Sequence, residues 1–454
     1  MIVLLVCYNV FDIIHFPAQG AHLWRQADCL AMVWNFKQSG TSFFVPEMYN
    51  LLSIDGKGVA EFPIFYYIAA KFPNPELVLR TLHSIMLFVA GYRFFQLAKY
   101  FLQSNFYSIS AVVLVFTSPL IIFYGINFLS DVPAFSCCII GLSFYFSNHT
   151  SKHKFMLCIL FLSLATLLKA SYFLYLFGII LYEYKERKFK NYNYIILFIL
   201  ICLPIIWYLY AFYINSKFGN TYYFLSSKPI YSMSLYDIGL AIWRITVSWS
   251  KTYFWRPTSV LVILFAIIFL IKSPKNELKQ ITLFTLIITI LFVLLFMQKL
   301  IIHEYYYAFF YTFILFAIIA LFLHLKNFEQ QQLIKFVVIV FLVINVFYCK
   351  YYIIEKQQAQ RIDKILFSKA FQEYLNNNDC DDFKTVFCFD DISLNQQLYA
   401  IKRKGFTQYN DWKKELNNNK IDFVLLQTKN VNKLNFNVSD KEKYVYRNYT
   451  LIKM

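Results

Sequence analysis

Long apolar runs recur through the first 354 residues of the chain and limit what it can fold into. A membrane-spanning helix needs roughly 20 consecutive apolar residues, with a range of about 17–25. Runs near this length predict spans at residues 2–15, 77–98, 106–124, 132–147, 155–169, 171–184, 193–214, 258–272, 281–298, 306–325 and 334–353. The pattern therefore predicts a polytopic α-helical membrane protein with about eleven transmembrane helices.

The composition agrees with this class of protein. Hydrophobic residues make up 59% of the 454 residues and charged residues only 15%, whereas a soluble domain is typically about 25% charged. Most of the net charge of +17 lies in short loops between apolar runs, as the positive-inside rule describes for membrane proteins. This distribution does not form a nucleic-acid-binding face, so the expected surroundings are the lipid bilayer and no nucleic acid.

Lysines and arginines in the short loops predict the orientation of the chain. One set of loops holds most of them, namely Arg93, Lys99, Lys152, Lys154, Lys185, Arg187, Lys188, Lys190, Lys272, Lys275, Lys279, Lys326 and Lys335. The opposite short loops hold only Lys169 and Lys299, so the rich side is predicted to be cytoplasmic. This assignment requires that the apolar run 61–72 lies at the interface without crossing. Residues 16–76, residues 215–257 and the residues after 354 are then expected outside.

The residues after 354 differ from the rest in being polar and mixed in charge. Alternating or compact apolar runs predict strands in 386–390 and 421–427 and near the C-terminus, and the segment 393–405 reads as a helix with Ser393 as N-cap and Gly405 as C-cap. We therefore expect two domains, a transmembrane domain at 1–354 and a small soluble α/β domain at 355–454 on the outer face.

Polar residues collect at the predicted outer ends of the apolar runs. They are Arg25, Gln26, Asp28, Lys57 and Glu61 in the first outer piece, and then Asp131, Lys169, His303 and Tyr305. Ionisable groups near a membrane are costly and often functional, and a single outward-facing pocket would explain why separate segments carry them on one side. Structural interpretations stay open, since arginine and lysine snorkel to headgroups, aspartate caps helices and tyrosine joins aromatic belts.

Three segments resemble the GT-C membrane glycosyltransferases: WRQADCLAMVWNF at 24–36, FFVPEMYNLLSIDGKGVAEFPIFYYI at 43–68 and SDVPAF at 130–135. The resemblance is closest to the bacterial branch of protein mannosyltransferase-like and aminoarabinose transferase-like enzymes, and it covers nearly the whole chain. It implies a GT-C transmembrane fold with a long first outer loop and a C-terminal α/β domain. It also implies inverting transfer of a sugar from a polyprenyl-phosphate donor to a glycan, lipid or protein acceptor, on the periplasmic face of a bacterial inner membrane.

The resemblance suggests roles for individual residues, with two departures from the family pattern. An acidic pair of the family would fall at Arg25–Gln26 in an ungapped alignment, so Asp28, about one turn later, is the expected general base. A Lys-Pro-Pro motif of the family is replaced by residues 61–63, EFP, which makes Lys57 a candidate substitute for the phosphate-binding lysine.

The other polar residues complete the expected site. Arg25, Gln26, Lys57 and Lys169 are expected to bind the donor phosphate or substrate, with His303 and Tyr305 lining the donor side. Glu61 and Asp131 are expected to position sugar hydroxyls as part of the catalytic group. A divalent cation, Mg²⁺ or Mn²⁺, is an open expectation, for which Asp28 and Asp131 would be the ligands.

Three other functions compete with glycosyl transfer. A transporter or lipid-linked glycan flippase typically has polar or broken helices at the bilayer midplane and internal repeats, and the sequence shows no repeat. A different enzyme that polymerises or ligates lipid-linked glycans would share the topology but lack the WRQAD and EFP segments. A structural or receptor protein would leave the polar cluster of the first outer loop unexplained.

Overall fold

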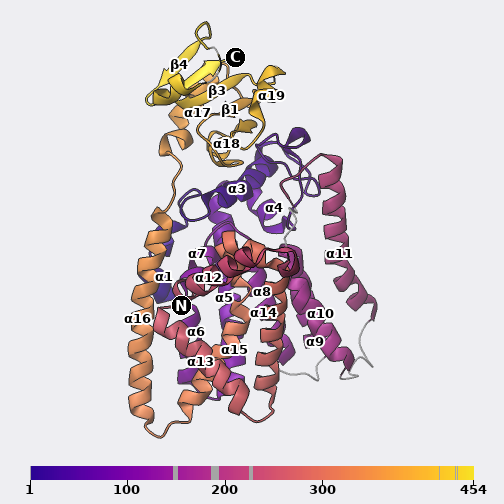
Figure 1. Ribbon diagram of the computed structural model, residues 1–454, viewed down its shortest axis with the longest axis vertical. Coiled ribbons are helices and arrows are strands. Elements are labelled where there is room, and N and C mark those ends of the chain that lie inside the picture. Colours follow the sequence, from indigo (N-terminus) through magenta and orange to yellow (C-terminus); the bar gives the residue numbers. More distant parts are fainter. Residues whose placement is uncertain are drawn as a thin grey trace. The chain divides into compact units, whose positions relative to one another are not determined.

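The computed structural model describes residues 2–146, 152–185, 194–223, 229–418, 420–434, 436 and 438–454, and most of them are helical (Figure 1). Three of the basic residues used above to assign the cytoplasmic side, Arg187, Lys188 and Lys190, lie outside these described residues.

The chain forms two compact units. The first, here called the helical unit, contains residues 1–15, 80–208 and 226–356. The second, here called the loop–tail unit, contains residues 16–79, 209–225 and 357–454. The C-terminal segment therefore belongs to the same compact unit as the first predicted outer loop.

The helical unit is built from helices that, apart from α12, coincide with the predicted apolar runs. They are α1 (Ile2–Cys7), α2 (Val10–Ile13), α5 (Pro75–Leu102), α6 (Asn105–Val115), α7 (Pro119–Gly125), α8 (Asp131–Phe146), α9 (Lys152–Leu168), α10 (Phe173–Lys185), α11 (Tyr194–Lys217), α12 (Leu235–Thr252), α13 (Arg256–Lys272), α14 (Glu277–Ile302), α15 (Tyr311–Lys326) and α16 (Gln331–Gln358). Short 3₁₀ turns lie at η2 (Ala170–Tyr172), η3 (Ile230–Ser232) and η4 (Glu304–Ala308). Helix α12 was not expected, because it lies in a segment assigned to an outer loop.

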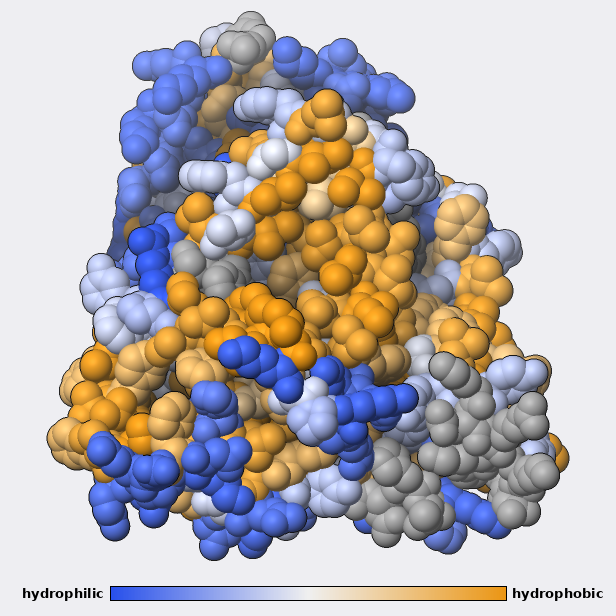
Figure 2. Space-filling view, turned by 60° about the horizontal axis from the view of Figure 1, so that its bottom comes forward, coloured by the Kyte–Doolittle hydropathy of each residue, from blue (hydrophilic) through white to orange (hydrophobic). Residues whose placement is uncertain are grey.

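Four helices of the described residues, α5, α11, α14 and α16, are long and apolar enough to cross a membrane. Helices α6 and α7 make a fifth candidate if they are counted as one span, bent by 65° at the break between them. Hydrophobic residues also cover a broad area of the face drawn in Figure 2. The chain is therefore a multi-pass membrane protein, while the number of about eleven spans stays a prediction.

The break between α6 and α7 has a local cause in the sequence. Pro119 is the first residue of α7, where proline is favoured because its missing N–H has no intrahelical partner there. The Ser118 hydroxyl accepts a hydrogen bond from the backbone N–H of Ile121 and so caps the new helix. This bend leads the chain into the segment 126–130, which precedes α8.

Two buried polar side chains of α5 hold the segment 126–130. Arg80 Nη1 donates to the carbonyl oxygen of Ile126 at 2.7 Å, and its guanidinium lies 4.0 Å from the ring centroid of Phe128. His83 Nδ1 lies 2.8 Å from the carbonyl oxygen of Asn127. These contacts satisfy backbone carbonyls that follow a helix end, and they fix the position at which α8 begins with Asp131.

The loop–tail unit combines the first outer loop with the C-terminal segment. The loop contributes α3 (Leu23–Gln38), η1 (Ile54–Gly56) and α4 (Ile64–Ala70). The C-terminal segment contributes η5 (Lys364–Phe367), α17 (Lys369–Asn377), β1 (Val386–Cys388), α18 (Gln396–Ile401), β2 (Gly405–Thr407), α19 (Trp412–Asn417), β3 (Phe423–Gln427), η6 (Thr428–Lys433), β4 (Lys443–Tyr446) and β5 (Tyr449–Lys453). Helix α4 has seven residues, or about 10 Å at 1.5 Å per residue, too short to cross a hydrocarbon core of about 30 Å.

The C-terminal strands form one sheet in the order β2-β1-β3-β5-β4. Strand β1 pairs in parallel with β2 and β3, whereas β5 pairs antiparallel with β3 and β4. The predicted α/β character of this segment is therefore confirmed. The predicted helix at 393–405 is too long, because α18 ends at Ile401 with Lys402 in the left-handed conformation, and Gly405 starts β2.

The first outer loop extends this sheet at its β2 edge. Asn50 forms a parallel bridge with Gly405, the Gly405 N–H donates to the carbonyl oxygen of Tyr49 at 2.9 Å, and the Leu51 N–H donates to the carbonyl oxygen of Gly405 at 2.8 Å. Pairing of this kind satisfies backbone groups that an edge strand would otherwise leave open. The loop and the sheet are thus joined through their main chains.

We predict that Gly405→Ala destabilises the protein. A Cβ atom at position 405 would overlap the carbonyl oxygen of Val386, and overpacking of this kind typically costs about 1–3 kcal/mol. The melting temperature of the purified protein in detergent measures the effect. Gly239→Ala, which meets no atom within 4 Å, is the matched control, and equal melting temperatures for the two variants would contradict the prediction.

Candidate active site

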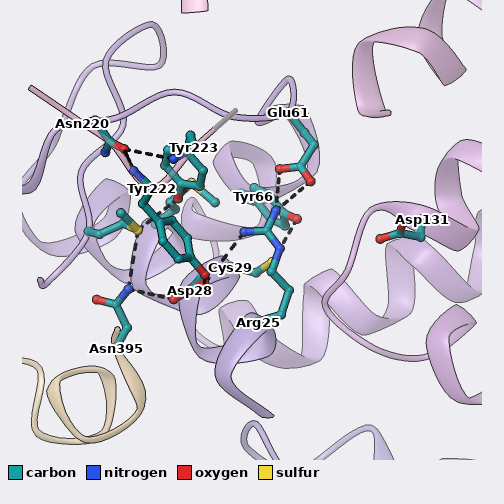
Figure 3. A network of polar contacts seen from close by, with 12 residues as sticks. Arg25, Asp28, Cys29, Glu61, Tyr66, Asp131, Asn220, Tyr222, Tyr223 and Asn395 are labelled. Carbon is teal, nitrogen blue, oxygen red and sulfur yellow. Dashed lines mark hydrogen bonds and ion pairs between the residues drawn. The ribbon is translucent and has the colours of Figure 1, made fainter. Parts of the chain in front are cut away.

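Asp28 is a fully buried carboxylate in α3, within the loop–tail unit. Its Oδ2 accepts a hydrogen bond from the hydroxyl of Tyr222 at 2.6 Å, and its Oδ1 accepts one from Asn395 Nδ2 at 2.8 Å. Figure 3 shows these two side chains converging on Asp28 from different parts of the chain. A buried carboxylate needs such donors, because charge without hydrogen bonds is strongly disfavoured away from water.

Arg25 and Glu61 form a buried ion pair beside Asp28. Arg25 Nη2 donates to Glu61 Oε1 at 2.7 Å and to Oε2 at 2.8 Å, and Arg25 Nη1 lies 3.9 Å from Asp28 Oδ2 (Figure 3). Since Arg25 and Asp28 are three residues apart on α3, they share one face of the helix. One guanidinium thus serves two carboxylates, and three residues predicted from the sequence lie together.

Asparagines place Tyr222 against Asp28. The side chain of Asn215 both accepts from the Val59 N–H at 2.8 Å and donates to the Val59 carbonyl oxygen at 2.7 Å. Asn220 Oδ1 then accepts from the backbone N–H of Tyr222 at 3.0 Å and of Tyr223 at 3.1 Å. The segment that follows α11 is therefore fixed to the first outer loop, with the Tyr222 hydroxyl directed at Asp28.

Asn395 is placed by a turn in front of α18. Asp391 Oδ1 accepts from the backbone N–H of Ser393 at 2.8 Å, and Asp391 Oδ2 accepts from the backbone N–H of Gln397 at 2.7 Å. A carboxylate in this place satisfies free N–H groups of the first helical turn. The Asn395 side chain also receives a hydrogen bond from the Asn50 N–H, at 2.9 Å to its Oδ1.

These surroundings shift the acidity of Asp28. Burial raises the pKa of its carboxyl from the ordinary value of 3.8 to about 6. The charge of Arg25 and the hydrogen bonds from Asn395 and Tyr222 oppose this rise, because they stabilise the ionised form. At neutral pH the group is therefore a carboxylate, with a proton affinity higher than that of an exposed aspartate, as suits a general base.

A second group of predicted residues lies in the helical unit. Lys169, in the break between α9 and η2, places its Nζ 3.2 Å from Oδ2 of Asp131, the first residue of α8. The Lys169 ammonium lies 5.6 Å from the ring centroid of Tyr305 and 5.3 Å from that of Tyr306. The His303 ring stacks on Tyr305 at 5.3 Å between centroids. Asp131, Lys169, His303 and Tyr305 are therefore connected.

A second buried lysine, Lys356 in α16, belongs to the same unit. Its Nζ lies 2.6 Å from both carboxylate oxygens of Glu304 and 5.6 Å from the ring centroid of Tyr124. The Tyr124 ring in turn packs edge-on against Tyr305, with centroids 6.1 Å apart. The helical unit thus gathers two lysines, each paired with a carboxylate, around one group of tyrosines.

Two predicted residues have other contacts in the structure. Lys57 Nζ pairs with Asp55 Oδ2 at 2.9 Å, so its ammonium is directed there instead of to Asp28. Gln26 Nε2 donates to the backbone carbonyl oxygens of Gln19 at 2.8 Å and Ala21 at 3.0 Å. Gln26 therefore holds the segment before α3 against the helix.

Comparison with known proteins bears on the fold. No protein-family model and no curated protein matches the chain. Among solved structures, ArnT from Cupriavidus metallidurans bound to undecaprenyl phosphate has a TM-score of 0.68 at 9% identity, over 99% of this chain and 96% of that chain. The chain has the GT-C fold. Apo ArnT gives a TM-score of 0.59 at 8% identity over the same shares. The archaeal oligosaccharyltransferase AglB from Archaeoglobus fulgidus, in complex with an inhibitory peptide and a dolichol-phosphate, gives 0.51 at 10% identity, over 94% of this chain and 69% of that chain.

Tyr222, Asn395 and Lys356 are among the residues of these two groups that the sequence analysis did not name. Tyr222 and Asn395 are 194 and 367 positions away from Asp28, so no local pattern connects them with it. Lys356 lies three residues beyond the predicted apolar run 334–353. A lysine so close to the end of an apolar run is the signal that could have identified it.

The two aspartates proposed as metal ligands are surrounded by donors. Asp28 faces Tyr222 and Asn395, and Asp131 faces the ammonium of Lys169. Within the part of the chain that the structure describes, no three His, Cys, Asp or Glu side chains are grouped so that they could hold a metal ion. As arranged, these donor-rich surroundings do not fit a cation.

We predict that Asp131→Asn destabilises the helical unit by roughly 3–5 kcal/mol, because it leaves the largely buried Lys169 ammonium without its partner carboxylate. Thermal unfolding in detergent measures the loss, and the double variant Asp131→Asn/Lys169→Gln should recover part of it. Asp379→Asn, at an exposed pair with Lys453, is the control. A melting temperature of Asp131→Asn equal to that of the control would contradict the role of this pair.

Proposed function

We propose that the chain is an integral membrane glycosyltransferase that moves a sugar from a polyprenyl-phosphate donor to an acceptor hydroxyl, with inversion at the anomeric carbon. The observation that carries this proposal is the buried Asp28 carboxylate with its raised pKa beside the Arg25–Glu61 pair, in a chain with the fold of ArnT. That ArnT was solved bound to undecaprenyl phosphate supports the class of donor.

Asp28 is the proposed general base. Its Oδ2 already accepts a hydrogen bond from one hydroxyl, that of Tyr222 at 2.6 Å, which illustrates the geometry in which an acceptor hydroxyl would donate its proton. As the proton moves to Asp28, the acceptor oxygen attacks the anomeric carbon, and the bond from that carbon to the phosphate oxygen breaks. Polyprenyl phosphate leaves with the electron pair, and a single displacement inverts the configuration.

The leaving phosphate needs positive charge and hydrogen-bond donors. Arg25 and Lys169 are the proposed sources, with Lys356 as a further cation beside the tyrosines of the helical unit. His303 and Tyr305 are proposed to line the donor side. Lys57 and Gln26 keep their predicted roles only if substrate redirects the contacts that they make here.

Glu61 and Asp131 are proposed to orient sugar hydroxyls, since carboxylates accept hydrogen bonds from such groups.

The proposed location is the inner membrane of a bacterium, with the loop–tail unit on the periplasmic side, as the distribution of lysine and arginine suggests. A glycan, a lipid or a protein would be the acceptor. Comparing transfer in EDTA with transfer in Mg²⁺ or Mn²⁺ tests whether the reaction needs a divalent cation.

We predict that purified protein in nanodiscs, supplied with a bacterial membrane extract as the source of acceptor, releases free polyprenyl phosphate from at least one donor in a panel of polyprenyl-phosphate sugars. We also expect that Asp28→Asn lowers the rate by about 100-fold or more. Loss of a general base typically costs about 10²–10⁴-fold. Asp379→Asn, an exposed acid of the C-terminal segment, should keep the wild-type rate. Near-normal release by Asp28→Asn would move the base to another residue, and release by no enzyme form would contradict the function.

We also predict a dependence of transfer on pH. Because the base must be ionised, kcat/KM should fall about tenfold for each pH unit below about 6, the pKa of Asp28, and level off above it. The same shift affects stability in the opposite sense. A folded-state pKa above 3.8 stabilises the folded protein at low pH, and this contribution is lost as the pH rises through about 6. A flat profile between pH 5 and 8 would contradict the assignment.

A further inference from the structure

The C-terminal segment contacts the proposed base directly. Asn395 is fully buried, and its Nδ2 lies 2.8 Å from Asp28 Oδ1. Both residues belong to the loop–tail unit, so the contact lies within one compact body. The proposed transfer step gives Asn395 no role, although its side chain is a direct hydrogen-bond partner of the proposed base Asp28 (Figure 3).

We infer that Asn395 is a positioning residue of the transfer reaction, through which the C-terminal segment holds and orients the Asp28 carboxylate. This inference rests on the proposed function, because it gives Asn395 its role through the base. Its consequence is that the C-terminal segment is part of the catalytic centre.

The orientation of the Asn395 amide follows from its other neighbour. The backbone N–H of Asn50 can only donate, and it lies 2.9 Å from the Oδ1 of Asn395. The carbonyl end of the amide must therefore face Asn50, and the NH₂ end must face Asp28. With this orientation Asn395 donates to the carboxylate, which favours its ionised form and lowers its pKa.

The contact also distinguishes the two oxygens of Asp28. Asn395 occupies Oδ1 and the Tyr222 hydroxyl lies on Oδ2. A hydroxyl group therefore reaches the carboxylate on the Oδ2 side, while the amide holds the other side and limits rotation of the carboxylate. Because the Tyr222 hydroxyl occupies Oδ2 in this structure, an acceptor that gives its proton to Oδ2 must take the place of that hydroxyl.

Two segments fix the position of Asn395, namely the turn before α18 and the stretch around Asn50 in the first outer loop. Asp391 and Ser393 form the turn that leads into α18, and the Asp391 carboxylate accepts from Gln397 at 2.7 Å. Asn50 lies between two asparagines of the C-terminal segment, since its Nδ2 also donates to Asn410 Oδ1 at 2.8 Å. Asn410 thus shares the partner Asn50 with Asn395, although it is half-buried where Asn395 is fully buried. Since its described contacts do not include Asp28, it is the control for an added carboxylate near Asn50.

The test compares Asn395→Asp with Asn410→Asp in the polyprenyl-phosphate release assay across pH 5–9. Asn395→Asp keeps an acceptor for the Asn50 N–H but places a second carboxylate against Asp28, and two such groups share a proton. We expect the acid limb of kcat/KM to move up by about one pH unit or more. The rate at pH 6 should then be about fivefold or more below that of the wild type and should recover toward pH 9. Asn410→Asp adds the same charge and should keep the wild-type midpoint.

A second readout does not depend on activity. The exchange variant Asp28→Asn/Asn395→Asp restores one amide and one carboxylate to the contact, so its melting temperature at pH 8 should exceed that of Asn395→Asp alone, while transfer stays lost. An acid limb of Asn395→Asp that coincides with that of Asn410→Asp would overturn the inference, as would an exchange variant that melts no higher than the single variant. If the wild type itself releases no polyprenyl phosphate, the proposed function fails, and the melting temperatures still decide whether the Asn395–Asp28 contact acts as described.

Discussion

The loop–tail unit is organised around the burial of one carboxylate. Asp28 has no contact with solvent, and a buried charge must be satisfied by donors or by an opposite charge. Here the donors come from three separate stretches of chain: Arg25 from the same helix, Tyr222 from the segment after α11, and Asn395 from the C-terminal segment. Satisfying this single group therefore requires that all three stretches adopt their places, so the unit forms together with its proposed reactive centre.

In the helical unit, ion pairs satisfy the charges of buried lysines. Lys169 and Lys356 are both largely buried, and each has a carboxylate partner, Asp131 and Glu304 respectively. Tyrosine and histidine rings surround these lysines. Paired charges in such surroundings add little stability compared with apolar packing, and ionisable groups retained near a membrane often have a function.

Much of the fold could be predicted from the sequence, because apolar runs of a given length have few alternatives in a membrane. Each predicted run coincides with helix, and the α/β character of the C-terminal segment follows from its composition and turns. The polar residues of the first loop were also found, since Arg25, Asp28 and Glu61 lie in an otherwise apolar context. The hydrogen-bond partners of Asp28 were not predicted. Tyr222 and Asn395 contact Asp28 only through the tertiary structure, which no local periodicity encodes. The predicted end of the helix around α18 was wrong for a similar reason. Local patterns place Gly405 at a helix end, but Gly405 pairs with Val386 in the sheet.

The main-chain bridge between Asn50 and Gly405 limits how chimeric proteins can be built from this chain. The sheet of the C-terminal segment acquires its outermost partner from a loop more than three hundred residues earlier in the chain. A cut at the end of the last long helix therefore does not separate two independent modules. A chimera that exchanges the C-terminal segment between homologous chains would have to carry the stretch around Asn50 with it, so that each sheet keeps the loop against which it was selected.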